Sequence, residues 1–242
     1  AIARHGRPVR VPLNRTADLN RLGRTTPLLT EKLGRVPPTE ELVREMMSMT
    51  PFPPDHVVAQ LYPTLRSATV EKIAVNAVAA GCKPVHLPAI IAAIEGIADP
   101  AFFLLVMGTN PSTPLVMVNG PDRTRMGLNC SYNTLGSGHR ANLTIGRAVH
   151  LVLQNVGMGG AFGVSDQTTI GMPGKIGMCM AENEEASPWE PLHVEWGWPK
   201  DVNTVTVFNV NATINIVDEE SKQPRPLLNT LGRSMNSLGI SN

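Results

Sequence analysis

The sequence is poor in charged and aromatic residues, and these two shortages limit what the protein can be. Only 17% of its 242 residues are charged and 4% are aromatic. A soluble domain usually has about a quarter of its residues charged, so we expect much of the surface to be covered, by the chain itself or by a partner subunit. The formal net charge is +1, and the arginines near the start have no interleaved aromatics to stack on bases. We therefore expect no nucleic-acid-binding face.

Long apolar runs and leader-like segments are also missing. No run approaches the roughly 18 apolar residues that a membrane span requires, and no charged-then-apolar leader is visible. The three cysteines, Cys82, Cys130 and Cys179, are an odd number at wide spacing, which argues against a disulfide framework. We therefore expect a cytoplasmic protein with reduced thiols and no membrane segment.

Motifs for nucleotide and flavin cofactors are absent. The glycine-rich stretch GLNCSYNTLGSGHRAN, residues 127–142, is not followed by G-K-[ST] and lacks the dinucleotide spacing, and GMGGAFG follows a helical pattern instead of a strand. No C-x-x-C pair or spaced Cys/His quartet exists, so we expect no structural zinc site. The cofactor is unknown, and a transition metal stays an open alternative.

The segments that are present mix helical and strand-like patterns. Residues 69–81 have helical apolar spacing with Thr69 as a cap and Gly81 as a left-handed end. Residues 87–98 are apolar nearly all round, which predicts a buried helix. We expect further helices at 38–49, at 139–157 and in the tail, and strands at 102–107, 115–118, 175–181, 204–210 and 212–217.

This mixture predicts an α/β or α+β fold in which a mixed sheet packs with helices in a single large domain. Residues 1–50 would form an extended N-terminal arm and a short helix, and residues 51–242 would form the main α/β domain. The arm would lie on a partner, so we expect a homo- or hetero-oligomer.

The stretch CMAENEEASPWEPLHVEWGW, residues 179–198, gathers a thiol, five glutamates, a histidine and all three tryptophans. Glu182, Glu184 and Glu185 follow an apolar strand and come shortly before Trp189. A low-dielectric wall and mutual repulsion would raise the pKa of at least one carboxyl group toward neutrality, as a general acid or base requires. The alternative is an acidic, solvated loop whose tryptophans anchor it to the core. We favour a site because prolines and tryptophans stiffen the loop.

Within this stretch His193 and Glu195 are two residues apart. If the segment is extended, both side chains point to one face and could share a hydrogen bond or a metal ion. These two residues would be the first metal ligands, with a nearby glutamate as the third.

The glycine-rich turn before residue 139 predicts an anion-binding cradle. Backbone N–H groups at a helix start carry partial positive charge, and Arg140 adds a full charge. An ordinary capped helix after a glycine-rich turn is the alternative. The residues that would hold a substrate are Ser137, Gly138, His139, Arg140, Asn142 and Trp189, with Lys175 as a second cationic contact.

Among the thiols, Cys130 lies in this glycine-rich loop and is the candidate nucleophile. Cys179 lies in a predicted strand, where a cysteine usually packs in the core.

Several motifs together resemble a family of poorly characterised bacterial proteins that are associated with, or fused to, a UGSC-type (seleno)protein domain. The motifs lie mostly within residues 69–208 and include TVEKIAVNAVAAGCKP, VNGP, GSGHRANLTIGRA, NVG, PGK and CMAENEEASPWEPLHVEWGW. Because the chain has no UGSC or CGSC motif, the resemblance implies that any such module lies on another chain. The similar proteins carry Ser in place of Cys130, which argues against a shared nucleophile there. The resemblance implies that the motifs act around one pocket and gives no reaction.

Two functions follow as expectations. The first is an enzyme, lyase- or hydrolase-like, that acts on a small polar or anionic substrate: one of Glu182, Glu184 and Glu185 would move a proton, and Asn183 and His193 would orient it. The alternative is a non-catalytic scaffold subunit of a hetero-oligomeric thiol- or redox-active complex. A third hypothesis is a binding protein for a small acid.

Overall fold

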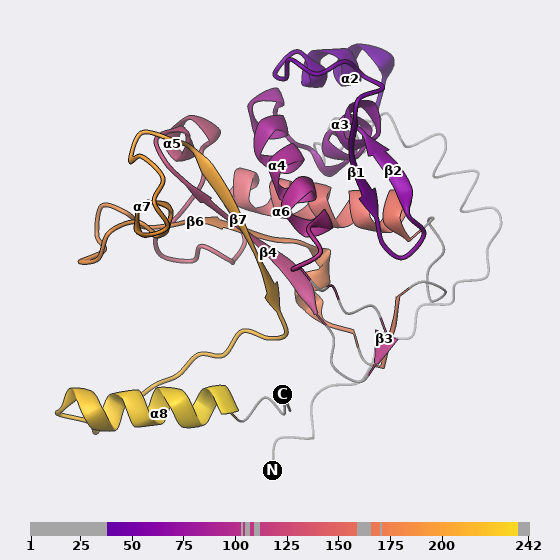
Figure 1. The fold of residues 1–242 in the computed structure, drawn as a ribbon. Coiled ribbons are helices and arrows are strands. Elements are labelled where there is room, and N and C mark those ends of the chain that lie inside the picture. Colours follow the sequence, from indigo (N-terminus) through magenta and orange to yellow (C-terminus); the bar gives the residue numbers. More distant parts are fainter. Residues whose placement is uncertain are drawn as a thin grey trace, which may run out of the picture. The chain divides into compact units, whose positions relative to one another are not determined.

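The computed structural model describes residues 38–102, 104, 107–108, 112–158, 166–169 and 171–236. Residues 38–242 cluster as one unit, in which helices pack on a mixed three-stranded sheet and a small antiparallel strand pair is added (Figure 1). The structure thus has the α+β architecture, one of the two fold classes that the sequence predicts, with the expected mixed sheet and packed helices. The expected N-terminal arm, residues 1–37, lies outside the described residues.

The elements are labelled in chain order: α2 (Glu40–Met47), β1 (Val57–Leu61), β2 (Arg66–Thr69), α3 (Val70–Ala80), η1 (Pro84–His86), α4 (Leu87–Ala98), β3 (Met107–Gly108), β4 (Thr113–Asn119), α5 (Asp122–Met126), α6 (Arg140–Val152), η2 (Leu153–Gly157), β5 (Gln167–Thr168), η3 (Pro173–Ile176), β6 (Met178–Ala181), α7 (Leu192–Glu195), β7 (Thr204–Val210) and α8 (Pro224–Asn236). No helix in the part of the chain that the structure describes has the length and apolar character to cross a membrane.

The central sheet has the strand order β6-β4-β7. β4 runs parallel to β6 and antiparallel to β7. Val116 and Val118 of β4 share one face with Cys179 and Ala181 of β6, and all four side chains are buried. Helices α4 and α6 contact this sheet, so the core lies between the sheet and the helices.

The main helices begin and end where the sequence predicts. The Thr69 hydroxyl accepts a hydrogen bond from the Lys72 N–H at the start of α3, and Gly81 ends the helix with a φ of 88°. Residues 87–98 form the buried α4, and α6 continues directly into the π-helical turn η2, which ends at Gly157. Apolar spacing and caps therefore place these helices correctly.

Other expectations are corrected. The main unit begins at Pro38, because Val43 and Met46 of α2 are buried, so this short helix belongs to the body and not to an arm. Residues 212–217 form no strand, since β-branched residues make a strand only where a neighbouring strand pairs with them. The hairpin of β1 and β2 is not predicted by the sequence.

Strand β7 is a sheet edge that lies beside α4. Among the described strands it pairs only with β4. Gly96 permits this close packing of helix and strand, because a Cβ atom at that position would lie 3.0 Å from Val207 Cγ2. In Figure 1, β7 is the long orange strand that crosses the sheet next to α4.

Candidate functional site

The acidic stretch follows β6 at the end of the sheet where β4 also ends. Because β4 and β6 are parallel, their carboxyl ends meet, with Val118 beside Ala181. The Glu182 N–H donates to Val118 O at 3.2 Å and extends this pairing by one step. The topology thus brings Asn119 and the glutamates together at one edge.

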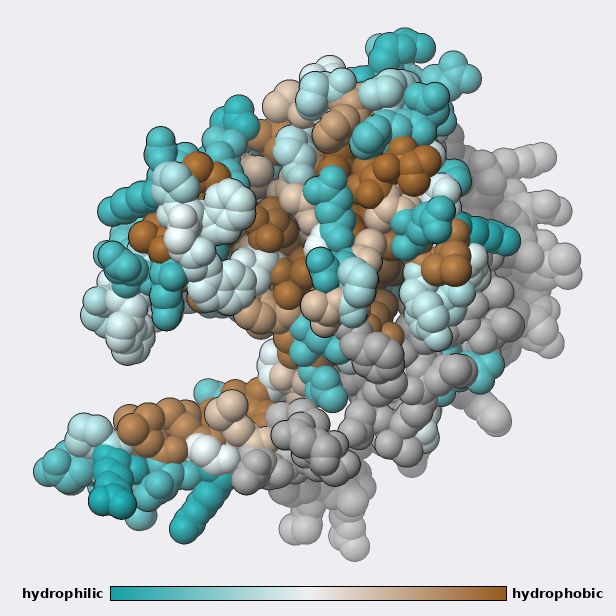
Figure 2. Space-filling model, viewed as in Figure 1, coloured by the Kyte–Doolittle hydropathy of each residue, from teal (hydrophilic) through white to brown (hydrophobic). Residues whose placement is uncertain are grey.

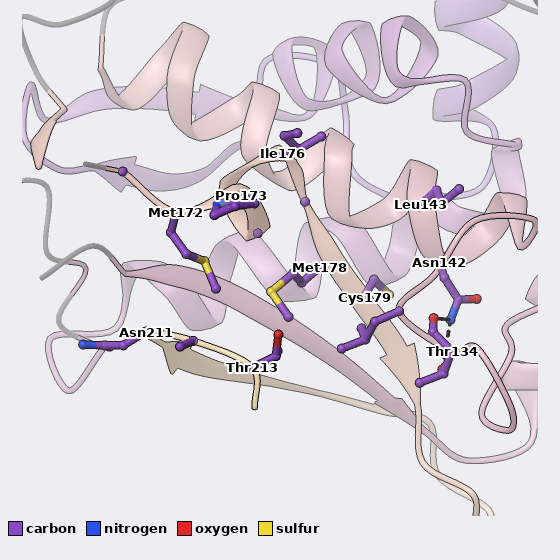
Figure 3. A pocket seen from close by; sticks show the side chains of 15 residues that line it. Thr134, Asn142, Leu143, Met172, Pro173, Ile176, Met178, Cys179, Asn211 and Thr213 are labelled. Carbon is purple, nitrogen blue, oxygen red and sulfur yellow. Dashed lines mark hydrogen bonds between the residues drawn. The ribbon is translucent and has the colours of Figure 1, made fainter. Parts of the chain in front are cut away.

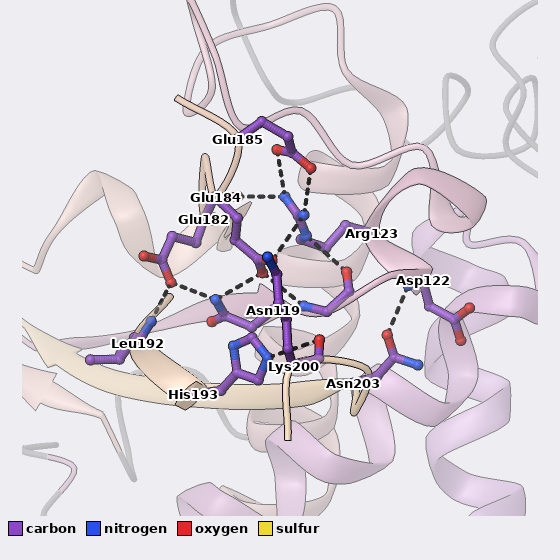
Figure 4. A network of polar contacts seen from close by, with 11 residues as sticks. Asn119, Asp122, Arg123, Glu182, Glu184, Glu185, Leu192, His193, Lys200 and Asn203 are labelled. Carbon is purple, nitrogen blue, oxygen red and sulfur yellow. Dashed lines mark hydrogen bonds and ion pairs between the residues drawn. The ribbon is translucent and has the colours of Figure 1, made fainter. Parts of the chain in front are cut away.

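The buried amide of Asn119 binds two of these glutamates (Figure 4). Its Nδ2 donates to Glu182 Oε2 and, at 3.1 Å, to Glu184 Oε1. The Gly120 N–H donates to the same Glu184 oxygen at 2.8 Å, and the Leu192 N–H donates to Glu182 Oε2 at 2.9 Å. These bonds tie both ends of the loop from Glu182 to Leu192 to the end of β4.

Arg123 of α5 supplies a positive charge to the cluster. Its Nε donates to Gly120 O at 2.8 Å, and its Nη1 donates to Glu182 O at 2.7 Å. Its Nη2 forms ion pairs with Glu184 Oε2 at 3.1 Å and with Glu185 Oε1 at 2.8 Å. Arg123 is only 8% exposed. Sequence reasoning missed this residue; the one available signal was that carboxylates at a buried strand end require a cation.

The expected rise in glutamate pKa does not occur at Glu185. The hydrogen bonds from Arg123 hold the pKa of the Glu185 carboxyl group below its usual range. The expected apolar wall is also missing, because Trp189, Trp196 and Trp198 are 78%, 61% and 55% exposed. Asn183 closes a turn, in which its carbonyl accepts from the N–H groups of Ala186 and Ser187. The network therefore fixes the loop in place.

The predicted anion cradle is used for internal contacts. Arg140 donates through Nε and Nη2 to Gly81 O, at 3.1 and 2.9 Å, and so satisfies the end of α3. The buried Asn142 donates to the carbonyls of Asn129 and Thr134, and the Ser137 carbonyl accepts from Asn133 Nδ2.

Of the remaining residues predicted to hold a substrate, Lys175 also has an internal partner. Gly138 has a φ of 109°, and His139 precedes α6 without a side-chain cap bond. Lys175 pairs with Asp166 at 2.8 Å. Among the described residues, the carboxylate groups of the three glutamates form their hydrogen bonds and ion pairs with Asn119, Gly120, Arg123 and Leu192, and none goes to the turn before Arg140.

The expected pairing of His193 with Glu195 is wrong, because the segment is helical. α7 spans Leu192–Glu195, and residues two apart on a helix point in different directions. His193 is 1% exposed, whereas Glu195 is exposed. Within the described ranges, no three His, Cys, Asp or Glu side chains gather as a metal ion would require.

Two of the three thiols are buried. Burial raises the pKa of Cys82 to about 12, and it also raises the pKa of Cys179, whose packing in the core is as predicted. Cys130 is half-buried and stays the thiol most open to reagents.

One large hollow is apolar. A cavity of about 620 Å³ lies between the start of α6, the η3 segment and residues 211–213, and Met172 and Met178 point into it (Figure 3). The polar group of Asn142 at its edge is bonded to Thr134, and the one titratable side chain among its described lining residues is the buried Cys179. This cavity offers little for acid–base chemistry.

A second hollow, which we call the α4–β7 groove, has a different lining. Its volume is about 680 Å³. Its walls come from Glu95, Gly96 and Asp99 at the end of α4, from His193, Trp196 and Trp198, and from residues 204–207 of β7. In the view of Figure 2, apolar side chains reach the surface over α4 and β7. Sequence reasoning named His193 but not α4 or β7, since no motif marks a groove formed by segments about 100 residues apart.

Buried polar atoms without partners gather around this groove. Among the described residues, the buried side-chain atoms with no hydrogen-bond partner are Asn119 Oδ1, Thr144 Oγ1, His193 Nδ1 and Thr204 Oγ1. Thr204 pairs with Asn119 across the sheet, and both Thr204 and His193 line the groove. Thr144 lies elsewhere, on α6. His193 Nε2 contacts Lys200 O at 3.4 Å. Because a carbonyl can only accept, Nε2 carries a proton, and in the neutral ring Nδ1 is then an acceptor.

The site is thus a groove with unmet hydrogen-bonding capacity, next to a glutamate loop that Arg123 holds closed. No protein-family model, curated protein or solved structure matches this chain.

Proposed function

We propose that the protein binds a small polar molecule in the α4–β7 groove. The observation that supports this most is the pair of unpartnered buried atoms, Thr204 Oγ1 and His193 Nδ1, on residues that line it. A buried polar group without a partner costs about 1–3 kcal/mol, and a ligand that completes its hydrogen bonds recovers part of that cost. Ligand sites commonly combine apolar walls with a few such polar groups.

The acid–base chemistry expected from the sequence stays a prediction. Before Glu184 or Glu185 could move a proton, it would have to leave its ion pair with Arg123. A binding function needs no such rearrangement, because Arg123, Glu184 and Glu185 do not line the groove, and two of its lining residues, Thr204 and His193, each keep a buried polar atom without a partner.

The proposal is tested by nuclear magnetic resonance titration of the whole chain with small cations, anions and neutral amides. We expect at least one class to shift the amide signals of residues 204–207 and the indole signals of Trp196 and Trp198. Binding of no class at these signals would contradict a ligand-binding groove.

A second candidate function is that of a subunit in an oligomer, and α8 is the observation that favours it. Leu227, Leu228 and Met235 on this helix are 42%, 64% and 69% exposed, and Figure 2 shows apolar side chains gathered along it. Exposed apolar stripes of this kind mark contact surfaces. Sedimentation velocity of the purified chain tests whether α8 is a subunit contact. The wild type should self-associate. Leu228→Ser should shift the protein toward the monomer, whereas Arg225→Ser on the same helix should not.

A further inference from the structure

We infer that the ligand of the α4–β7 groove is an organic cation that carries N–H groups, an ammonium or a guanidinium. This inference rests on the ligand-binding function proposed above and gives that ligand a chemical class. It is opposite in charge to the anionic substrate that the sequence suggested.

The groove wall is negatively charged. Glu95 and Asp99 both line the groove and are exposed, and its described lining residues include neither Lys nor Arg. The Ala101 N–H occupies only one oxygen of Asp99, at 2.7 Å, which leaves the other oxygen for a ligand. Two carboxylates without a cation create a local field that attracts positive charge.

The end of helix α4 adds partial negative charge to the groove. This 12-residue helix ends at Ala98, so its carbonyl groups, with their partial negative charge, lie at the same end of the groove as Glu95 and Asp99. The helix end and the side chains of Glu95 and Asp99 therefore both favour a positively charged ligand. The whole described body has the same bias, because residues 38–242 hold 13 Lys and Arg against 18 Asp and Glu, a net charge of −5.

The groove also has an aromatic wall. Trp196 and Trp198 line the groove while more than half of each is exposed. Indole is the best of the protein side chains at binding a cation over its face. Tryptophans beside unpaired carboxylates are the usual means of recognising organic cations.

The hydrogen-bonding groups of the groove also suit a donor. His193 is 1% exposed, lines the groove and has a nitrogen, Nδ1, without a partner, which is an acceptor in the neutral ring. An ammonium or guanidinium group supplies donors only, so it matches this acceptor, the two carboxylates and the lone pairs of the Thr204 hydroxyl group, whereas a carboxylate or phosphate ligand would meet the like charge of Glu95 and Asp99.

The cation could be a free molecule or an arginine side chain of an extended peptide, because both present the same group. The edge of β7 with which no described strand pairs could add hydrogen bonds to a peptide but not to a free cation. The test therefore includes a probe of each kind.

The experiment is a titration of the full chain, followed at the Trp196 and Trp198 indole signals, with butylguanidinium, butyrate and butyramide as matched probes. We expect butylguanidinium to bind at least tenfold more tightly than the other two. The peptide probe is acetyl-Val-Arg-Val-amide. If it binds more tightly than butylguanidinium, the natural ligand is an arginine side chain of a peptide; if the two bind equally, the natural ligand is a free cation.

Matched variants assign the contacts. Glu95→Gln combined with Asp99→Asn should weaken butylguanidinium at least tenfold, and Glu45→Gln, an exposed glutamate on α2, should have no effect. Trp196→Leu should weaken it by about 2- to 30-fold, whereas Trp189→Leu, outside the groove, should not. Circular dichroism and thermal unfolding confirm that each variant is folded.

The outcomes separate the two proposals. Tighter binding of butyrate or butyramide in the groove would overturn the cation assignment and leave the ligand-binding function standing. No perturbation of the groove signals by any probe would contradict the ligand-binding function itself.

Discussion

At the scale of single residues, the unpaired hydroxyl group of Thr204 allows ligand binding in the groove to be tested separately from the stability of the fold. Thr204 Oγ1 is buried and lacks a partner, so it costs free energy in the unliganded protein. The same is true of Thr144 Oγ1 on α6, which lies outside the groove. These two threonines form a matched pair for testing what the groove is for.

We predict that Thr204→Val leaves the free energy of unfolding unchanged or raises it by up to about 1 kcal/mol, because valine has the same shape and no unmet hydrogen bond. The variant should also lose affinity for the ligand of the groove. Thr144→Val should behave alike in urea unfolding but keep that affinity. A clear loss of stability in Thr204→Val would mean that its hydroxyl group already has a partner, such as a bound water.

The thiols give a second prediction at this scale. Because burial raises the pKa values of Cys82 and Cys179, we expect an aromatic disulfide reagent at pH 8 to modify one thiol per folded chain, Cys130. In denaturant all three should react. Cys130→Ser should abolish the fast reaction, and rapid labelling of that variant would show that a buried thiol becomes accessible.

At the scale of elements, the Arg123 network holds the loop between β6 and α7. Glu184 is 9% exposed as a side chain, so its charge depends on Arg123. Removal of one member of a buried pair typically costs about 3–5 kcal/mol, because the remaining charge stays buried without a partner.

We therefore predict that Arg123→Leu lowers the free energy of unfolding by about 3–5 kcal/mol, and that Arg123→Lys loses less, because lysine keeps the charge but not the forked geometry. Arg125→Leu is the control: it removes the exposed pair with Asp122 on the same helix and should cost about 0–1 kcal/mol. Equal losses for the two arginines, measured by urea unfolding, would mean that the network does not hold the loop.

The same elements show what a sequence can and cannot predict. Helices α3, α4 and α6 follow from local spacing and caps, because the residues that decide them lie within one helical turn. The strand expected at residues 212–217 fails because a strand depends on a neighbour that local sequence does not specify. The glutamates at the end of β6 were predicted to form a site from their place after a strand alone. Asn119, Arg123 and Glu95 come from distant segments, and their positions required the topology.

At the scale of the whole molecule, buried histidine makes stability depend on pH. His86 accepts the Lys83 N–H through Nδ1 and donates through Nε2 to Met126 O, and burial lowers its pKa from the ordinary value of 6.5. Below pH 6.5 the unfolded chain binds a proton at this residue that the folded chain does not, so folding is disfavoured as the pH falls from 6.5 toward the lowered value.

We predict that the free energy of unfolding is level near pH 7.5 and declines below pH 6.5, by at most about 1.4 kcal/mol per pH unit for this residue. His86→Gln should reduce that slope, and His139→Gln should not. Glu185 acts in a separate range: its pKa is lowered from 4.5, so its contribution is present above 4.5 and is lost only in stronger acid. A slope that is unchanged in His86→Gln would assign the effect to other groups.

The order of the strands has a consequence for synthesis. β4 ends at Asn119, but its neighbours begin only at Met178 and Thr204. Until the ribosome reaches β6, both edges of β4 are unpaired. Its apolar face also lacks α6 until that helix has been made. A nascent chain released before residue 204 would expose that strand permanently, so truncated products should accumulate in inclusion bodies or on chaperones, whereas chains that reach residue 210 can close the sheet on both sides.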